Sequence, residues 1–270
     1  EPNLINDSIG ELFFKIAIPA SVGTVFMTLY NVVDTYFAGK ISPEALAALA
    51  QTFPVYFIII SMGVGLSIGT TSLISNALGE KKQKKASYVL AQSITLAIIT
   101  AFFVSFIGIY LGPSIILLMN DSYGTMLLSM EYLNIIFIGS IFIFIQMAVN
   151  SSLSSIGDTK TNRNILIFSF FLNIFLNPLF IFGYGIIPAM GMKGIAISTV
   201  ISQGLGTGYI IYKASKTEFS NYLYLDCFKP KIKILLDLLK QGVPASIGMM
   251  MKPFLKNNWK LARCTNYFFQ

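Results

Sequence analysis

Residues 13–37 read FFKIAIPASVGTVFMTLYNVVDTYF, an apolar run long enough to cross a bilayer as a single helix. An aspartate, Asp34, lies in the last third of this run. A carboxylate inside a membrane span is costly, and such residues commonly belong to functional sites. Asp34 is therefore the first candidate for a functional residue.

The composition places the rest of the chain in the same apolar environment. Of the 270 residues, 54% are hydrophobic and 11% are charged, and the mean hydropathy is +0.70. Each apolar stretch has about the 20 residues that a helix needs to cross the hydrocarbon core. The six stretches are residues 13–38, 46–75, 88–111, 127–152, 164–187 and 191–212. They are apolar on all sides, which argues against a transmembrane barrel and predicts an all-α polytopic membrane protein.

The net charge of +7 is a topology signal rather than a nucleic-acid patch. Basic residues gather in the alternate loops at residues 81–85, 160–163 and 213–240, whereas the opposite loops hold only Lys40 and Lys193. The positive-inside rule places loops rich in lysine and arginine in the cytoplasm. We therefore expect a multi-pass protein of the cell membrane with a cytoplasmic N-terminus, in contact with lipid and not with nucleic acid.

The residue constellations of enzymes and metal sites are missing from the sequence. The chain contains no histidine, and its two cysteines, Cys227 and Cys264, lack the spacing of metal ligands. No candidate nucleophile is accompanied by a base. We expect no enzymatic activity, no catalytic residue, no bound metal and no cofactor.

A short internal repeat suggests a second copy of the architecture. Residues 15–23 read KIAIPASVG and residues 240–248 read KQGVPASIG, with lysine, proline, alanine, serine and glycine in register. The second copy starts after six complete spans, where the second half of a transporter built from repeated helical halves would begin.

The second copy then stops resembling a span. After Met251 the sequence continues KPFLKNNWKLARCTNYFFQ, with four basic residues in 19. We expect an incomplete seventh helix and a truncation; a short amphipathic tail lying on the membrane is the alternative. The predicted divisions are a six-helix lobe at residues 1–212, a cytoplasmic linker with an amphipathic segment at 213–240, and a truncated second lobe with an atypical tail at 241–270.

Pro19 and Gly23 predict a bend in the first span. Proline cannot donate the i to i−4 hydrogen bond and its ring crowds the preceding turn, while a glycine one turn later lowers the resistance to bending. A movable bend on the helix that contains Asp34 would suit a coupling element. A static kink is the alternative.

Small residues in the second span predict close helix packing. Gly63, Gly65 and Gly69 lie in an apolar helix with no strand before them, which excludes a phosphate-binding loop. Small residues at helical spacing allow two transmembrane helices to approach closely.

Two asparagines in the fifth span are a second polar feature. Asn173 and Asn177 are four residues apart and share one helix face. Amides facing lipid would be costly, so we expect both inside the lobe, where their oxygens could accept from a protonated acid or bind a cation. A hydrogen-bond network that only holds helices together is the alternative.

Six segments in order resemble one family, the multidrug and toxic compound extrusion (MATE) transporters, and the resemblance extends from Leu12 to about Met251. The segments are IPASVG, NVVDTYFAG, GVGLSIGTTSLISNALGEKK, SSLSSIGDTKTN, LNIFLNPLFIFG and GMKGIAISTVIS. The resemblance implies twelve helices in two six-helix lobes, of which this chain supplies the first. It also implies export of drugs, toxic compounds or metabolites in exchange for protons or sodium, with small organic, cationic or amphipathic substrates.

The resemblance also implies a coupling site. It assigns the Thr199 hydroxyl to the polar cluster of Asp34, Asn173 and Asn177. Because burial penalises a charged carboxylate and the chain has no histidine to take the role, we expect Asp34 to be the proton-responsive residue. The family often has aspartate at the position of Asn177, and the amide weakens any case for tight sodium binding because hard cations prefer charged oxygens. A chain without its second lobe is expected not to transport by itself.

Two other functions remain open at this point. A flippase for lipid-linked sugars could share the architecture, but its lobe would be expected to contain basic residues for the phosphates, and the spans contain almost none. A membrane receptor or structural protein is the second alternative. Asp34 and the amide cluster argue against it.

Overall fold

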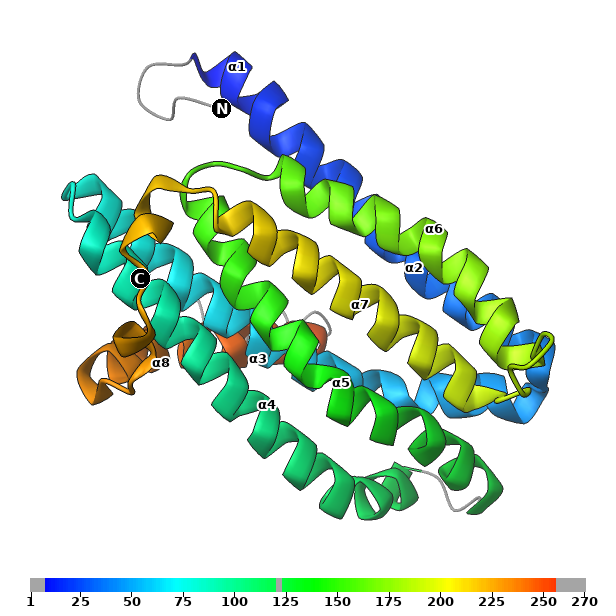
Figure 1. The fold of residues 1–270 in the computed structure, drawn as a ribbon. Coiled ribbons are helices and arrows are strands. Elements are labelled where there is room, and N and C mark those ends of the chain that lie inside the picture. The colour runs from blue at the N-terminus through cyan, green and yellow to red at the C-terminus, as the bar shows by residue number, and fades with distance from the viewer. Residues whose placement is uncertain (1–7, 120–122, 256–270) are drawn as a thin grey trace.

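The computed structural model describes residues 8–119 and 123–255, which form a bundle of long helices (Figure 1). Its elements are α1 (Ile9–Leu12), a π-helical stretch (Phe13–Ala17), α2 (Ile18–Ile41), α3 (Pro43–Gly79), α4 (Gln83–Met119), α5 (Tyr123–Ser155), α6 (Lys160–Phe182), α7 (Met192–Ala214), two 3₁₀ turns (Glu218–Tyr222 and Leu225–Phe228) and α8 (Ile232–Leu255). Within the described residues, seven helical segments are long and apolar enough to cross a membrane. The prediction of an all-α, polytopic membrane protein is confirmed.

Local sequence sets the ends of the helices. Ser42 caps α3, because its hydroxyl accepts from the Ala45 amide at 3.0 Å and Pro43 occupies the first turn. The fifth predicted stretch ends earlier than expected: α6 stops at Phe182 because Gly183 has a positive φ of 76°, and a turn follows instead of a further helical turn.

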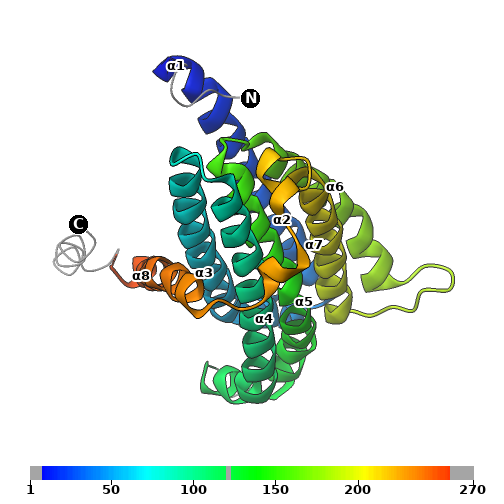
Figure 2. The same cartoon turned by 60° about the vertical axis from the view of Figure 1, so that its left-hand side comes forward.

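The bundle is organised around α5. This helix contacts α3, α4 and α7, while α2 packs on α6 at the edge of the molecule. Figure 2 shows the long helices side by side. The turns that join α3 to α4 and α5 to α6 lie at the same end of the bundle as the last residues of α7 (Figure 1). The basic residues of these two turns and of the end of α7 therefore share one end of the molecule.

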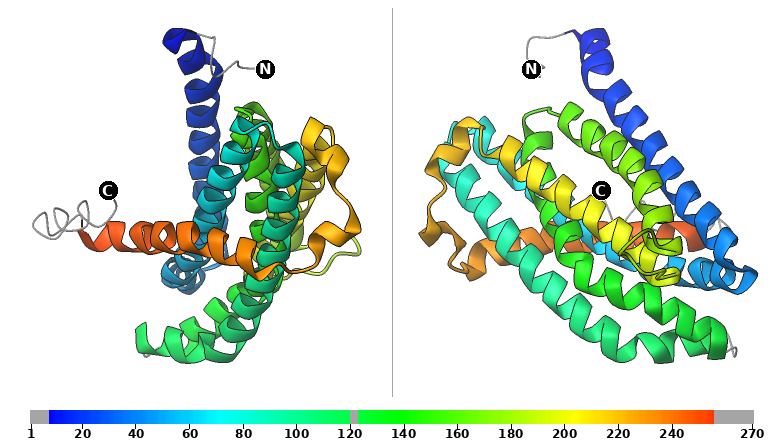
Figure 3. Two further views of the ribbon diagram at one scale, coloured as in Figure 1. Left: turned by 90° about the vertical axis from the view of Figure 1, so that its left-hand side faces the viewer. Right: turned by 45° about the vertical axis from the view of Figure 1, so that its right-hand side comes forward.

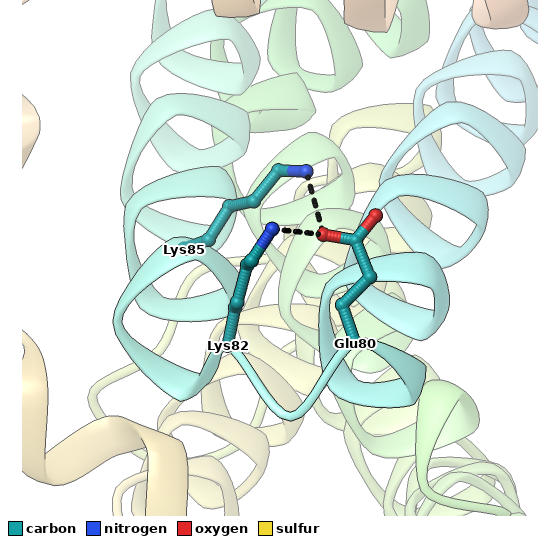
Figure 4. Close-up of polar contacts among 3 residues, drawn as sticks. All are labelled: Glu80, Lys82 and Lys85. Carbon is teal, nitrogen blue, oxygen red and sulfur yellow. Dashed lines mark hydrogen bonds and ion pairs between the residues drawn. The ribbon is translucent and has the colours of Figure 1, made fainter.

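One of those basic turns is shown in Figure 4. Lys82 and Lys85 both approach Oε2 of Glu80, at 3.0 Å and 3.4 Å. The hydrogen bond and charge of Lys82, together with Lys85, lower the pKa of this exposed glutamate. Lys81 adopts a positive φ of 57°, which lets the chain reverse direction between α3 and α4.

The last helix is longer than the sequence predicts. α8 begins at Ile232, inside the region predicted as linker, and its residues Ile232–Met251 are long and apolar enough to cross a membrane. The apolar residues of the amphipathic segment before Lys240 supply the missing length. Figure 3 shows that α8 crosses the bundle instead of running along it.

Glycines allow this crossing. A Cβ atom on Gly65 would lie 2.4 Å from the carbonyl oxygen of Gly242, and one on Gly69 would lie 2.8 Å from that of Leu238. A Cβ atom on Gly63 would lie 2.2 Å from the side-chain sulfur of Met147 of α5. The prediction that these glycines serve helix packing is confirmed.

Candidate functional site

Asp34 lies inside the bundle, where α2 meets α6 and α7. Its exposed fraction is only 6%, and it is the one buried carboxylate among the described residues. A buried ionised carboxylate must be compensated by hydrogen bonds or charges. No lysine or arginine of the described residues forms an ion pair with it, so the compensation comes from neutral donors.

Three predicted residues surround this carboxylate and donate to it. The side-chain amides of Asn173 and Asn177 donate to Oδ1 at 3.0 Å and 2.9 Å, and the Thr199 hydroxyl donates to Oδ2 at 3.3 Å. All three donors are buried. The structure therefore brings together the four residues that the sequence analysis selected as the polar cluster.

Helical spacing explains how α6 and α7 supply these donors. Asn173 and Asn177 are one turn apart on α6 and form a ladder, since the Asn177 amide also donates to Oδ1 of Asn173 at 2.9 Å. Thr199 comes from α7, whose next residue toward the N-terminus, Ser198, donates its hydroxyl to Oδ1 of Asn177. Ser198 was missed by the sequence analysis, and only its place beside Thr199 in the GIAISTV segment could have suggested it.

The network engages every side-chain oxygen of Asp34, Asn173 and Asn177. Oδ1 of Asn173 and Oδ1 of Asn177 each already accept a hydrogen bond, and both carboxylate oxygens accept from neutral donors. Among the described residues there is no group of three or more histidine, cysteine, aspartate or glutamate side chains that could hold a metal ion. The cluster is built to surround one carboxylate with donors.

Two cavities share Tyr30, Asn31 and Tyr56 as lining residues. One, of about 290 Å³, is also lined by Asp34 and Thr199. The other, of about 280 Å³, extends away from the carboxylate and is lined by uncharged residues. Its carboxamides are Asn31, Gln146, Asn150, Asn162 and Gln203.

Several polar atoms around these cavities have no partner within the described part of the chain. The buried Tyr30 hydroxyl lies close to Asn173 and Thr199 without a hydrogen bond of good geometry. Oδ1 of Asn150 and Oε1 of Gln203 are also buried without partners. Buried polar groups are normally satisfied by protein, water or ligand, so these walls are suited to polar guests.

The residues predicted to bend the first span occupy a different position. Pro19 lies in the first turn of α2, directly after the π-helical stretch Phe13–Ala17, so the helical ladder changes type where the proline interrupts it. Gly23 lies against α6, where a Cβ would be 3.1 Å from Leu166. The predicted bending role of both residues stays a prediction.

Comparison with known proteins identifies the family. The model of the MatE family matches residues 19–179. The chain belongs to the MATE family. This MATE chain is 28% identical over 199 residues to a FAD transporter of Shewanella oneidensis, covering 74% of this chain and 44% of the relative. It is 29% identical over 240 residues to the probable multidrug resistance protein YoeA of Bacillus subtilis, covering 87% and 51%.

A solved structure extends the MATE likeness to the fold. A MOP superfamily transporter from Pyrococcus furiosus superposes with a TM-score of 0.80 at 27% identity, over 91% of this chain and 54% of that one. The chain thus spans about half the length of the relatives it matches. The resemblance stated from the sequence is confirmed, and the chain is a multi-pass membrane protein of a transporter family.

Proposed function

We propose that this chain is one lobe of an ion-coupled exporter of small organic compounds, and that Asp34 is its coupling residue. The observation on which the proposal rests is a single buried carboxylate that accepts hydrogen bonds from two helices and lines a cavity. A carboxylate of this kind can gain or lose a proton inside the membrane. Such a change alters its hydrogen bonds with Asn173 and Asn177 of α6 and with Thr199 of α7.

Protonation would reverse the role of Asp34 in the cluster. The ionised carboxylate accepts from Asn173, Asn177 and Thr199. A proton on Oδ2 would turn that oxygen into a donor, so the Thr199 hydroxyl would have to rotate or withdraw. The contact between α2 and α7 therefore differs between the two protonation states, and a guest that prefers one state is exchanged for a proton.

The same network favours a proton over sodium as the coupling ion. Sodium would need several oxygens turned toward it, whereas the side-chain nitrogens of Asn173 and Asn177 point at the carboxylate and their oxygens accept from Asn177 and Ser198. With an amide at position 177, the cluster has one charged ligand. A proton needs only one oxygen of Asp34.

The walls of the two cavities suit small organic guests that are cationic or amphipathic. Tyrosine rings of Tyr30, Tyr56 and Tyr132 line the cavity next to Asp34, and aromatic faces attract cations. Among the residues that the structure describes, no lysine or arginine lines either cavity. This composition disfavours the alternative of a flippase for lipid-linked sugars, whose phosphates would call for basic residues.

A second lobe completes the path in this proposal. The chain covers 44% and 51% of two of its curated relatives, one named as a FAD transporter and the other as a probable multidrug resistance protein. The substrate is therefore a property of the whole protein, which we place in the cell membrane.

The test is ethidium efflux by the whole protein in vesicles under separate proton and sodium gradients. We expect a proton gradient alone to drive efflux, and Asp34→Asn to abolish it because asparagine cannot titrate. Asp158→Asn, which keeps an oxygen to cap the first turn of α6, is the matched control and should transport normally. Near-normal, proton-driven efflux by Asp34→Asn would refute the coupling role; efflux driven by sodium alone would refute the assignment of the ion.

A further inference from the structure

The segment between α7 and α8, residues 215–231, lies along α4 and does not hang free at the end of the bundle. We call this segment the linker. Its two 3₁₀ turns each contact α4, and its side chains Phe219 and Cys227 are buried with exposed fractions of 2%. The sequence predicts a cytoplasmic linker with an amphipathic segment here, and not a contact with α4.

One side chain of α4 makes most of the polar contact. Gln92 is fully buried, and its amide nitrogen donates to the carbonyl oxygens of Cys227 and Lys229 at 2.6 Å and 2.8 Å. Its amide oxygen accepts from the backbone nitrogen of Lys231 at 2.7 Å. Three backbone groups of the linker are therefore satisfied by one glutamine of α4.

Neighbouring residues of the same α4 face extend this contact. The Thr95 hydroxyl donates to the carbonyl oxygen of Phe228 at 3.1 Å, and the Ser87 hydroxyl donates to that of Phe219. The Lys231 ammonium group lies 4.1 Å from the centre of the Tyr88 ring. Since a helix rises about 1.5 Å per residue, the contacts from Ser87 to Thr95 cover roughly 12 Å of α4.

We propose that Gln92 is a positioning residue that fastens the linker to α4 and thereby sets where α8 begins. Lys231, the last residue that Gln92 binds, is followed at once by Ile232, the first residue of α8. From that point α8 reaches the glycine face of α3, where Leu238 and Gly242 meet Gly69 and Gly65. The start of α8 consequently moves with α4 as one unit. The proposal goes beyond the coupling role of Asp34 and does not depend on it.

Cys227 provides a native reporter of this contact, because its thiol is buried in the 3₁₀ turn of the linker that lies against α4. The experiment uses the whole chain in lipid nanodiscs with Cys264→Ser, so that Cys227 is the only thiol. The rate of maleimide labelling of Cys227 is measured for Gln92→Leu and for the matched control Ser93→Ala. Ser93 is the next residue of α4 and equally buried, but it bonds Thr70 of α3 and not the linker.

We expect Gln92→Leu to raise the labelling rate by roughly tenfold or more, since three hydrogen bonds are lost and buried backbone groups are left unpaired. Ser93→Ala should label as slowly as the parent. In the same samples, deuterium exchange at the Lys231 amide should accelerate only in Gln92→Leu.

A milder variant keeps the proposal testable if Gln92→Leu does not fold. Thr95→Val removes one hydrogen bond to the linker and should give a smaller rise in labelling, of a few fold. Unchanged labelling of Cys227 in a folded Gln92→Leu protein would overturn the proposal. So would equal acceleration in Ser93→Ala, which would mean that any weakening of α4 opens the linker, or fast labelling of Cys227 in the parent.

Discussion

Asp34 differs from the other carboxylates of the described residues because it is buried, and two side-chain amides and a hydroxyl donate to it. Glu80 and Glu131, for example, lie at the ends of the bundle beside lysines and remain partly exposed. The donors of Asp34 come from two different helices, so the state of one carboxylate affects the contacts of α2 with both α6 and α7. Asn173 connects the carboxylate to Asn177, since it donates to Asp34 and accepts from Asn177.

Replacing Asn173 should lower the stability of the lobe, an effect that can be measured without a transport assay. Asn173→Ala leaves a buried carboxylate oxygen with one donor fewer and the Asn177 amide with one acceptor fewer. We expect a loss of roughly 1–3 kcal/mol in the free energy of unfolding. Asn164→Ala, on the same helix but exposed, is the control and should stay within about 0.5 kcal/mol of the parent. Reversible unfolding in mixed detergent measures both, and equal effects of the two substitutions would contradict the structural account of the cluster.

At the scale of the elements, α8 is held on the lobe by small residues and by the linker. α3 and α8 approach so closely that their backbones are in contact at Gly65 and Gly242. Close approach of this kind replaces the hydrophobic drive that is missing between helices in lipid. It also makes the crossing sensitive to one added methyl group.

Gly65→Ala should therefore displace α8. The new Cβ would lie 1.9 Å from the Ser246 hydroxyl oxygen and 2.4 Å from the Gly242 carbonyl oxygen, and the second of these is backbone that cannot rotate away. We expect a destabilisation of about 1–3 kcal/mol and faster deuterium exchange in α8. Gly208→Ala is the matched control, because a Cβ there meets no atom within 4 Å and alanine is the better helix former. Unchanged exchange of α8 in Gly65→Ala would show that the helices do not cross at this glycine.

At the scale of the whole molecule, helical periodicity and apolar length were enough to predict the helical lobe, and spacing within one helix was enough to pair Asn173 with Asn177. Contacts between distant segments were harder. Gln92 binds backbone atoms 135 and more residues further along the chain, and such a contact leaves no periodic pattern in the sequence. Ser198 was missed for the same reason, since its partner Asn177 lies on another helix. The length of α8 was underestimated because its first turns are amphipathic and read as a linker.

The orientation of the chain in the membrane can be tested by labelling. The turns containing Lys82 and Lys160 and the linker residue Lys231 are expected on the cytoplasmic side, and the loops containing Lys40, Asp121 and Lys193 outside. Cysteines at positions 82 and 193, in a protein with Cys227 and Cys264 replaced by serine, can be labelled from outside intact cells with an impermeant maleimide. We expect position 193 to react and position 82 to react only after permeabilisation. The opposite pattern would invert the topology.

The proposed coupling role of Asp34 requires its carboxylate to take up a proton inside the cluster. Infrared difference spectroscopy of the purified chain in lipid, recorded across a pH titration, detects the carbonyl band of a buried protonated carboxyl group. We predict such a band in the parent and in Asp158→Asn, and its loss in Asp34→Asn. A band that persists in Asp34→Asn, or a carboxyl group of Asp34 that stays ionised at every pH at which the chain is folded, would contradict the account.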